Sequence, residues 1–431
     1  SLSFGKVVAY SPRGLLPQSC PYCGVTAPKI KEYVTKEITH SALTTQKCII
    51  KYRARRYKCS CCGKTYYEFN PFVFKSQKIS ILTVHNILKD LKDFNETFTS
   101  VARRYHVSPT SVSTIFDKHV DIGRNPLPEI INFDEVYAFK SEKSKYVCVL
   151  LDFKKQIPVD VLPNRKKEYL LNYFQKIPLE ERKKVKYACS DMYEVYRDVV
   201  HKVFPSCCML LDYFHLSQDF HRKMNEVRIK VMKGYKDNKA SDEYYLLKKF
   251  NWLLFKNPED EDKYGRLFDV ERERQYNSHF KSYMNYYDLR KKLLEINNDL
   301  TICYSLKLEL VDFYSKSTID NAKVNLENLI RSCIDTNIDE MIAFSNNLIN
   351  WKQEIINSFT IVGTEYKVEA DKGQVVVCNK KVNNAIIENR NKIIKCIKNN
   401  ANGYTNWSRF RNRVMYVLDP NATFSLEPRE K

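Results

Sequence analysis

No run of about 18 or more apolar residues occurs in this 431-residue chain, so no segment is long enough to cross a bilayer as a helix. The first residues, from Ser1 to Lys6, lack the pattern of a secretory signal peptide. No internal repeat or long low-complexity segment is present, and 43% of the residues are hydrophobic. These features argue against a membrane-spanning or disordered chain and predict a folded protein of roughly two to four domains.

Acidic residues are few relative to basic ones. The chain has 71 Lys and Arg residues against 51 Asp and Glu residues, which gives a net charge of +20 and a pI of about 9.2. Such an excess favours a polyanionic partner such as nucleic acid, because binding releases counterions. The alternative is that the charge reflects only a Lys- and Asn-rich chain from an AT-rich genome.

A disulfide framework is also missing, although the chain has 14 cysteines. Most are scattered, and several, such as Cys148, lie among apolar residues, which is typical of small buried side chains in a cytosolic protein. Two Cys-x-x-Cys pairs stand apart, Cys20 with Cys23 and Cys59 with Cys62, and each pair is followed by glycine. This is the spacing of a four-cysteine site, in which two tight turns direct four thiolates at one structural zinc ion.

Residues 1–72 therefore form the first predicted domain, a zinc ribbon. The stretch between the cysteine pairs alternates in polarity, which predicts a β-ribbon. Its arginines, Arg53, Arg55 and Arg56, are candidates for contacts to DNA phosphates. An ordinary solvated strand face is an equally good interpretation of these three residues.

Residues 73–124 are predicted to be helical and to fit a helix-turn-helix DNA-binding domain. Val101 and Ala102 are expected to face the core, where a small residue lets the helices approach each other. Ser108 suits the N-cap of the second helix and Pro109 its first position. The side chains of this second helix expected to reach DNA are Ser111, Ser113, Thr114 and Lys118. A plain helical hairpin is the alternative.

The pattern changes to strands after a linker at 125–128. Strands are predicted at 130–139, 146–152, 157–162, 185–190 and 208–212, with a helix from about 192 to 203 between the last two. Three consecutive strands followed by strand, helix and strand is the order of an RNase H-like α/β catalytic core, assigned to residues 129–215.

Residues 216–370 are charged and aromatic with helical periodicity, which predicts a large all-α insertion in the core. A strand at 373–378 and a helix from about 383 to 398 then return to the core, whose second part is assigned to residues 371–418. Residues 419–431 are expected to form an irregular tail. The predicted fold class is thus α+β and multidomain.

Three acids stand out by position. Asp134 lies within an apolar strand, where an unpaired carboxylate is costly, Asp191 ends the fourth strand, and Glu388 lies on the last helix. The ends of neighbouring strands are where α/β sheets place their sites, so the three carboxylates are expected to converge as catalytic acids. They would hold two Mg or Mn ions, which prefer oxygen ligands and support phosphodiester chemistry. Each acid taken alone is more often a strand end or an ion pair.

Further polar residues lie near these acids. Asp212 and His215 follow the fifth strand and are candidate accessory residues, with a buried strand end and a satisfied histidine as the alternative. Glu135 is expected to point to the opposite sheet face from Asp134, because side chains alternate along a strand. Arg411 is a candidate contact to DNA phosphates, with an ordinary surface charge as the alternative.

Together these residues resemble a bacterial DDE transposase of the ISL-three insertion-sequence family. The resemblance is carried by the two cysteine pairs, the helix-turn-helix, Phe133-Asp134-Glu135, Ser190-Asp191-Met192, the segment from Asp212 to His215, and Glu388 with Asn391. It implies Asp134, Asp191 and Glu388 as the catalytic triad, with a helical insertion before the glutamate. One position departs from the family pattern, since members often have glycine where this chain has Asn389.

The resemblance implies an enzyme that binds the terminal inverted repeats of an insertion sequence as double-stranded DNA. It would cleave the strands and transfer them to target DNA, as a homodimer or larger assembly, in the bacterial cytoplasm in association with the nucleoid. One alternative is a non-catalytic zinc and helix-turn-helix regulator derived from a decayed transposase, although the presence of all three acids argues against it. A metal-dependent nuclease without strand transfer is the other.

Overall fold

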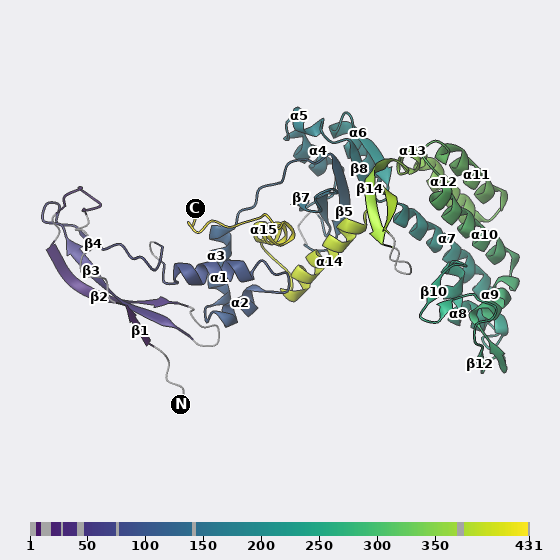
Figure 1. Ribbon diagram of the computed structural model, residues 1–431, viewed down its shortest axis with the longest axis horizontal. Helices are drawn as coiled ribbons and strands as arrows, with labels where there is room; N and C mark the ends of the chain where they lie inside the picture. The colour runs from purple at the N-terminus through teal and green to yellow at the C-terminus, as the bar shows by residue number, and fades with distance from the viewer. Residues whose placement is uncertain are drawn as a thin grey trace.

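The protein is arranged along one long axis, with a β-sheet at the N-terminal end, a mixed α/β body in the middle and a helical region at the far end (Figure 1). The computed structural model describes residues 6–9, 19–26, 29–40, 47–74, 77–139, 144–368 and 375–429. None of the helices within these ranges has both the length and the apolar character that a bilayer span requires.

The N-terminal sheet is built around one central strand, β3. Its strands are β1 (Lys6–Ala9), β2 (Lys29–Thr39), β3 (Ile49–Lys58) and β4 (Thr65–Tyr67). Both β2 and β4 pair with β3 in antiparallel fashion, whereas β1 is parallel to it. Tyr52 and Ala54 of β3 are buried while Arg53 between them is exposed, so the predicted alternation is confirmed.

Three helices follow, α1 (Ile81–Asp90), α2 (Phe98–Arg104) and α3 (Pro109–His119). The hydroxyl of Ser108 accepts a hydrogen bond from the backbone N–H of Ser111, and Pro109 occupies the first turn, so the predicted start of α3 is confirmed. Val101 and Ala102 are buried, as expected. The turn between α2 and α3 includes His106 in a left-handed conformation, with φ of 55°.

The central sheet has five strands in the order β7-β6-β5-β8-β9. Their bounds are β5 (Ile130–Val136), β6 (Val147–Asp152), β7 (Pro158–Leu162), β8 (Tyr187–Ser190) and β9 (Cys208–Leu211). The first three are antiparallel to one another, and β5, β8 and β9 are parallel. The first and fourth strands of this segment, β5 and β8, therefore lie side by side. Every strand is buried along most of its length, because helices cover both faces.

Alternation along the strands sends their side chains to two different helical layers. Phe133 packs in the cluster with α4 (Lys167–Gln175) and α6 (Glu194–Val203), which are joined by α5 (Leu179–Arg182) and the strand β8. Val149 packs on the other face with α14 (Ala385–Asn400) and α15 (Trp407–Leu418). Helices from the C-terminal end of the chain therefore complete a sheet formed much earlier in the sequence.

The segment between β9 and α14 folds around a hydrophobic core of its own. Its helices are α7 (Tyr213–Gly234), α8 (Asp242–Lys249), the 3-10 helix η1 (Asn251–Phe255), α9 (Tyr286–Glu295), α10 (Asn298–Lys316), α11 (Ala322–Asp335), α12 (Asp339–Asn350) and α13 (Lys352–Asn357). The expectation of an all-α segment is wrong in detail. Two short hairpins interrupt the helices, made of β10 (Glu261–Asp262) with β11 (Gly265–Arg266) and of β12 (Gln275–Asn277) with β13 (Ser282–Met284).

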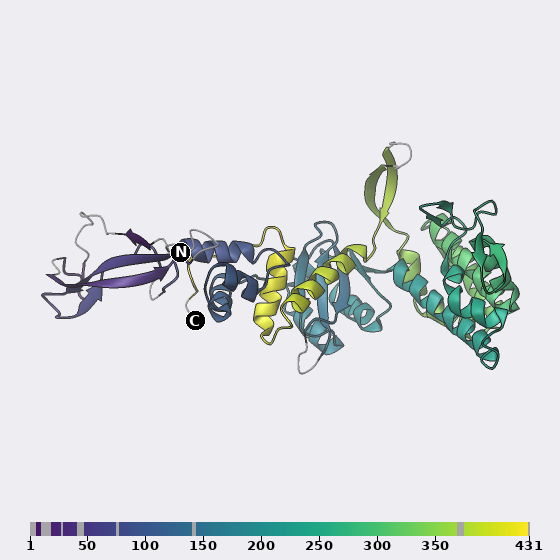
Figure 2. The same ribbon diagram turned by 90° about the horizontal axis from the view of Figure 1, so that it is seen from below.

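A longer hairpin precedes α14. Its strands, β14 (Ile361–Val368) and β15 (Val375–Lys381), are antiparallel and project away from the rest of the chain (Figure 2). The predicted strand at 373–378 thus belongs to a separate hairpin. Its first two positions, 373 and 374, and the predicted domain boundary at 370–371 lie outside the described residues.

Helix α15 joins the three N-terminal helices to the central sheet. The hydroxyl of Tyr416 donates to the carbonyl of Leu88 at 3.0 Å, and buried Arg413 donates to the carbonyls of Asp93 and Glu96. The following tail has no helix or strand between 419 and 429, but the Ser425 N–H bonds to the carbonyl of His119 at 3.0 Å. The segment around Ser425 therefore lies against the end of α3 and is hydrogen-bonded to it (Figure 1).

Candidate functional site

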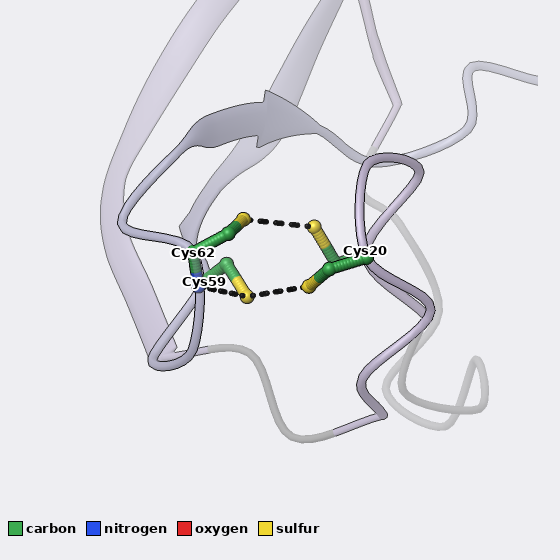
Figure 3. Close-up of side chains that lie close together, drawn as sticks. Cys20, Cys59 and Cys62 are labelled. Carbon is green, nitrogen blue, oxygen red and sulfur yellow. Dashed lines mark hydrogen bonds between the residues drawn. The ribbon is translucent and has the colours of Figure 1, made fainter.

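The two cysteine pairs come together in the N-terminal sheet. The Sγ atoms of Cys20 and Cys62 are 3.7 Å apart and those of Cys23 and Cys59 are 3.5 Å apart, with all four within 4.8 Å of one another (Figure 3). Four thiolates bound tetrahedrally at about 2.3 Å from one zinc ion lie about 3.8 Å apart. The arrangement therefore fits a structural zinc ion.

Each pair lies on a tight turn that ends in glycine. Gly24 and Gly63 have φ angles of 74° and 69°, a region that side chains other than glycine rarely adopt. The backbone N–H of Cys62 points at the Cys59 sulfur from 3.5 Å, and this hydrogen bond lowers the pKa of Cys59 to about 6. This turn thus favours the thiolate at Cys59, the form that binds metal, whereas the contact with the Cys59 sulfur raises the pKa of Cys23 to about 12.

Three aspartates lie along the three parallel strands of the central sheet, with Asp134 inside β5 and with Asp191 and Asp212 directly after β8 and β9. Asn132 of β5 is in register with Cys189 of β8. Asp134 and Asp191 each follow two residues later, so they lie opposite each other. The N–H of Asp212 donates to the Ser190 carbonyl at 3.1 Å, which places Asp212 beside Asp191. Because β5, β8 and β9 are neighbours, the three carboxyls lie in a row along one sheet edge.

Burial makes these carboxyls costly to ionise. Asp134 is 8% exposed and Asp212 is 2% exposed. Burial, reinforced by the charge of Asp191, raises the pKa of Asp134 to about 7. Burial and the charge of Glu135 raise the pKa of Asp191 to about 6, and burial also raises the pKa of Asp212. A bound divalent cation would relieve this crowding of negative charge.

Glu388 approaches the row from α14, but on the side of Asp212. Its Oε1 atom is 3.8 Å from Nε2 of His215, which is itself 3.8 Å from Oδ2 of Asp212. The potential ligand atoms of these three residues all lie within 4.8 Å of one another. The predicted triad and the predicted accessory pair therefore occupy one region, in which Glu388 is grouped with Asp212 and His215.

Buried asparagines hold the acids in place. The side-chain amide of Asn391 donates to Oδ2 of Asp134 at 2.7 Å, and the backbone N–H of Asn384 donates to Oδ1 of Asp212 at 3.2 Å. Asn132 reaches the side-chain oxygen of Asn384 at 2.6 Å. Sequence reasoning missed the roles of Asn132 and Asn384. The spacing of Asn391 three residues after Glu388 was the available signal, since such residues share a helix face.

Several buried polar atoms at this edge have no hydrogen-bond partner among the described residues. They are Oδ1 of Asn132, Oδ1 of Asp191, Oδ2 of Asp212, Nε2 of His215 and Oδ1 of Asn391. Buried polar atoms are normally satisfied, so a group of exceptions in one place indicates a missing ligand. Most of these atoms are oxygens, which suits Mg or Mn.

Glu135 belongs to a different environment from its neighbour Asp134. Its carboxylate contacts Arg165 and accepts a hydrogen bond from the hydroxyl of Tyr196 at 3.4 Å. Tyr196 belongs to the cluster on the α4 and α6 face of the sheet, opposite α14. The alternation expected from the sequence explains this difference.

We expect Asp134→Asn to stabilise the protein when no divalent ion is present. A carboxyl whose pKa is raised to about 7 on folding loses stability as the pH rises from about 4 to 7, and all of that loss is present above pH 7. Asparagine does not ionise and keeps an acceptor for Asn391. At pH 8 in EDTA, thermal or urea unfolding should show a gain of about 1–3 kcal/mol.

The gain should shrink towards pH 4, where the aspartate is protonated in both the folded and the unfolded states. Added Mn²⁺ should raise the melting temperature of the wild type more than that of the variant. A variant less stable than wild type at pH 8 in EDTA contradicts this interpretation of Asp134.

The predicted DNA-contacting residues of the ribbon are not equivalent. Arg53 is exposed, with its guanidinium over the ring of Tyr33. Arg55 lies 3.7 Å from the carboxylate of Glu68, and Arg56 pairs with Glu32 at 2.7 Å. Of these three arginines, Arg53 is the one whose charge is most available to a phosphate.

The predicted DNA-contacting residues of α3 lie off its buried stripe, which consists of Val112, Ile115, Phe116 and His119. Thr114 is exposed, and Ser111, Ser113 and Lys118 are partly exposed. The hydroxyl of Ser111 also lies 2.8 Å from that of Ser108, at the start of the helix. Their contacts to DNA stay predictions.

Arg411 has a structural role that the sequence did not indicate. Its Nε donates to Oδ1 of Asp160 at 2.7 Å and its Nη1 to the carbonyl of Ile122 at 2.7 Å. Asp160 is only 4% exposed, so the pair is an interior link between α15 and β7. The Arg411 guanidinium is thus already paired within the protein, and its contact to DNA phosphates stays a prediction.

Taken together, the four-cysteine turns and the carboxylate-lined sheet edge define a zinc-ribbon protein with a mixed α/β body. Comparison with known families identifies it further. A family model described as transposase, for DDE transposases of the ISL3 type, matches residues 131–370, more than half of the chain. The chain belongs to this transposase family.

Two other comparisons agree with this assignment. A second model, described as the zinc-finger of the transposases of IS204, IS1001, IS1096 and IS1165, matches residues 16–62. The chain is also 19% identical over 405 residues to the transposase for insertion sequence element IS1001 of Bordetella parapertussis. That match covers 94% of this chain and 89% of the relative.

Proposed function

We propose that this protein binds the terminal inverted repeats of an insertion sequence and cleaves and joins DNA strands with Asp134, Asp191 and Glu388 as its catalytic triad. The observation that carries the proposal is the row of carboxyls formed by Asp134 on β5, Asp191 after β8 and Asp212 after β9, with Glu388 brought to the same edge by α14. In this proposal the central sheet is an RNase H-like core, and the segment from α7 to α13 is an insertion between Asp191 and Glu388.

The triad would hold two Mg or Mn ions, which when bound activate an oxygen nucleophile and stabilise the leaving oxygen of a phosphodiester. The chain's own contribution is to fix the carboxylates before DNA arrives. The amide of Asn391 orients Asp134, and the β5–β8 register sets the place of Asp191 beside it. Such preorganisation reduces the reorganisation needed in the transition state.

DNA recognition is assigned to the N-terminal third of the chain. The zinc ribbon would present Arg53, and α3 of a helix-turn-helix would present Thr114 and Lys118 to the terminal repeat. The net charge of +20 supports binding to a polyanion such as the ends of the element and the target. Because two ends are joined in transposition, a dimer or larger assembly on the DNA is part of the proposal. The bacterial cytoplasm, in contact with the nucleoid, is its expected location.

Two alternatives share much of this structure. A regulator derived from a decayed transposase would bind the ends without chemistry, and a nuclease would cut without joining. The unpartnered buried ligand atoms favour a working metal site over the regulator.

A strand-transfer assay separates these alternatives. A labelled duplex carrying the element's own end, incubated with a plasmid and Mg²⁺ or Mn²⁺, should give plasmid-joined label that EDTA abolishes. Cleavage without joining supports the nuclease. Tight end binding with neither reaction supports the regulator, and would contradict the proposed function.

A further inference from the structure

The grouping of Glu388 with Asp212 and His215 is a separate feature of the sheet edge. Asp212 is the N-cap residue of α7 and His215 lies in the first turn of that helix, so the helix geometry brings the two side chains to one side. Glu388 comes from α14, which lies far away in the sequence. Two carboxylates and one imidazole, from two elements, thus converge within 4.8 Å.

The distances within this group do not fit a set of direct hydrogen bonds. Nε2 of His215 is 3.8 Å from both carboxylates, which is longer than a hydrogen bond. Ligand atoms at about 2.1–2.2 Å from one ion lie about 3–4.4 Å apart, depending on their angle. The two separations of 3.8 Å from His215 fall within this range and are too long for hydrogen bonds.

The state of Asp212 supports this interpretation independently. The residue is 2% exposed, and its Oδ1 is occupied by the N–H of Asn384. Its other oxygen, Oδ2, is buried and has no hydrogen-bond partner among the described residues, and it is the oxygen that lies nearest to His215. A buried, unpaired carboxylate oxygen is expensive unless a cation or a donor meets it.

We propose that Asp212, His215 and Glu388 form a divalent-metal site with one nitrogen and two carboxylate ligands. This inference rests on the proposed function, and it assigns one of the two ions to these residues and the other to Asp134 and Asp191. Imidazole nitrogen is a ligand for first-row transition-metal ions, whereas Mg²⁺ prefers oxygen. The site therefore selects Mn²⁺ over Mg²⁺, and His215 is the residue that determines this preference.

Nitrogen coordination can be tested directly with Mn²⁺ as the probe. Full-length protein is titrated with Mn²⁺, and pulsed EPR of the bound ion detects coupling to a ligand nitrogen. In the wild type we expect such a coupling, and labelling the histidines with ¹⁵N should change its frequency. His215→Gln should lose the coupling and bind the corresponding Mn²⁺ about tenfold or more weakly.

Two variants serve as controls. His221→Gln removes another histidine of α7 that is not part of the group, and it should retain the nitrogen coupling. Asp134→Asn should weaken binding of the other Mn²⁺ ion, and it should retain the nitrogen coupling as well. The ¹⁵N experiment uses the wild type only, so it tests for a histidine ligand even where His215→Gln does not fold, and a wild type without histidine coupling overturns the site.

The outcomes distinguish this inference from the proposed function. Bound Mn²⁺ that depends on Asp134 but shows no nitrogen coupling overturns the His215 site and leaves the transposase proposal standing. Coupling that survives in His215→Gln also overturns it. No binding of Mn²⁺ by any form of the protein overturns both proposals.

Discussion

Asp191→Asn is expected to abolish cleavage and strand transfer while leaving binding to the element's end unchanged. The substitution keeps the size of the side chain and removes the charge at the centre of the row, between Asp134 and Asp212. Removing one member of a preorganised catalytic group commonly lowers the rate by about 10³-fold or more. End binding should persist, because the residues assigned to recognition lie in the first 124 positions.

The measurement is cleavage of the labelled end duplex in Mn²⁺, with binding followed in parallel by fluorescence anisotropy. Asp198→Asn is the matched control, since Asp198 is 43% exposed on α6 and pairs with Lys167 at the surface. It should cleave at the wild-type rate, because exposed ion pairs contribute about 1 kcal/mol or less. Cleavage by Asp191→Asn within a few-fold of wild type would remove this residue from the catalytic site.

Loss of the four-cysteine site is expected to remove specific end binding, through Cys59→Ser or through strong chelators. Among its described residues, the N-terminal sheet has two small hydrophobic clusters, around Tyr52 and around Tyr57. Zinc binding contributes about 10–16 kcal/mol in isolated zinc-finger peptides, so a sheet with so little core depends on the metal. We expect end affinity to fall by about 10²-fold or more, towards the level of non-specific binding.

Cys61→Ser is the matched control, because Cys61 lies in the same turn but is exposed and outside the four-sulfur group. It should retain zinc, as measured by metal analysis, and should retain end affinity. The central sheet should remain folded in Cys59→Ser, since its hydrophobic clusters do not include the ribbon. Full end affinity in a zinc-free protein would show that the ribbon is not needed for recognition.

The parts of the molecule that the sequence predicted well are those fixed by short-range spacing. The cysteine pairs, the cap at Ser108 and the alternation along β3 all depend on residues within a few positions of one another. The order of the central strands was also predictable, because parallel neighbours and short connections leave few arrangements. The two hairpins of the helical segment were missed, since strands of two or three residues give almost no periodic signal.

In the candidate site, too, some features were predicted from local sequence and others were not. The sequence identified Asp134 and Asp191 because a carboxylate in or after an apolar strand is conspicuous. It did not indicate that Glu388 is grouped with His215 or that Asn391 holds Asp134, since these contacts join segments far apart in the chain. Nor did it indicate that Arg411 pairs with Asp160, since that contact joins α15 to β7, a distant part of the chain.

The sequence by itself determined the zinc-binding turns, the start of α3, the order of the central strands and the identity of the family. Each of these follows from local backbone preferences or from a pattern of spacing. Only the tertiary structure decided which polar side chains meet at the sheet edge. It also decided that Arg411 pairs with Asp160 and that Arg413 is buried. Those outcomes depend on how α14 and α15 pack on a sheet formed much earlier in the chain, and packing between distant segments is set by the shape and burial of the whole fold.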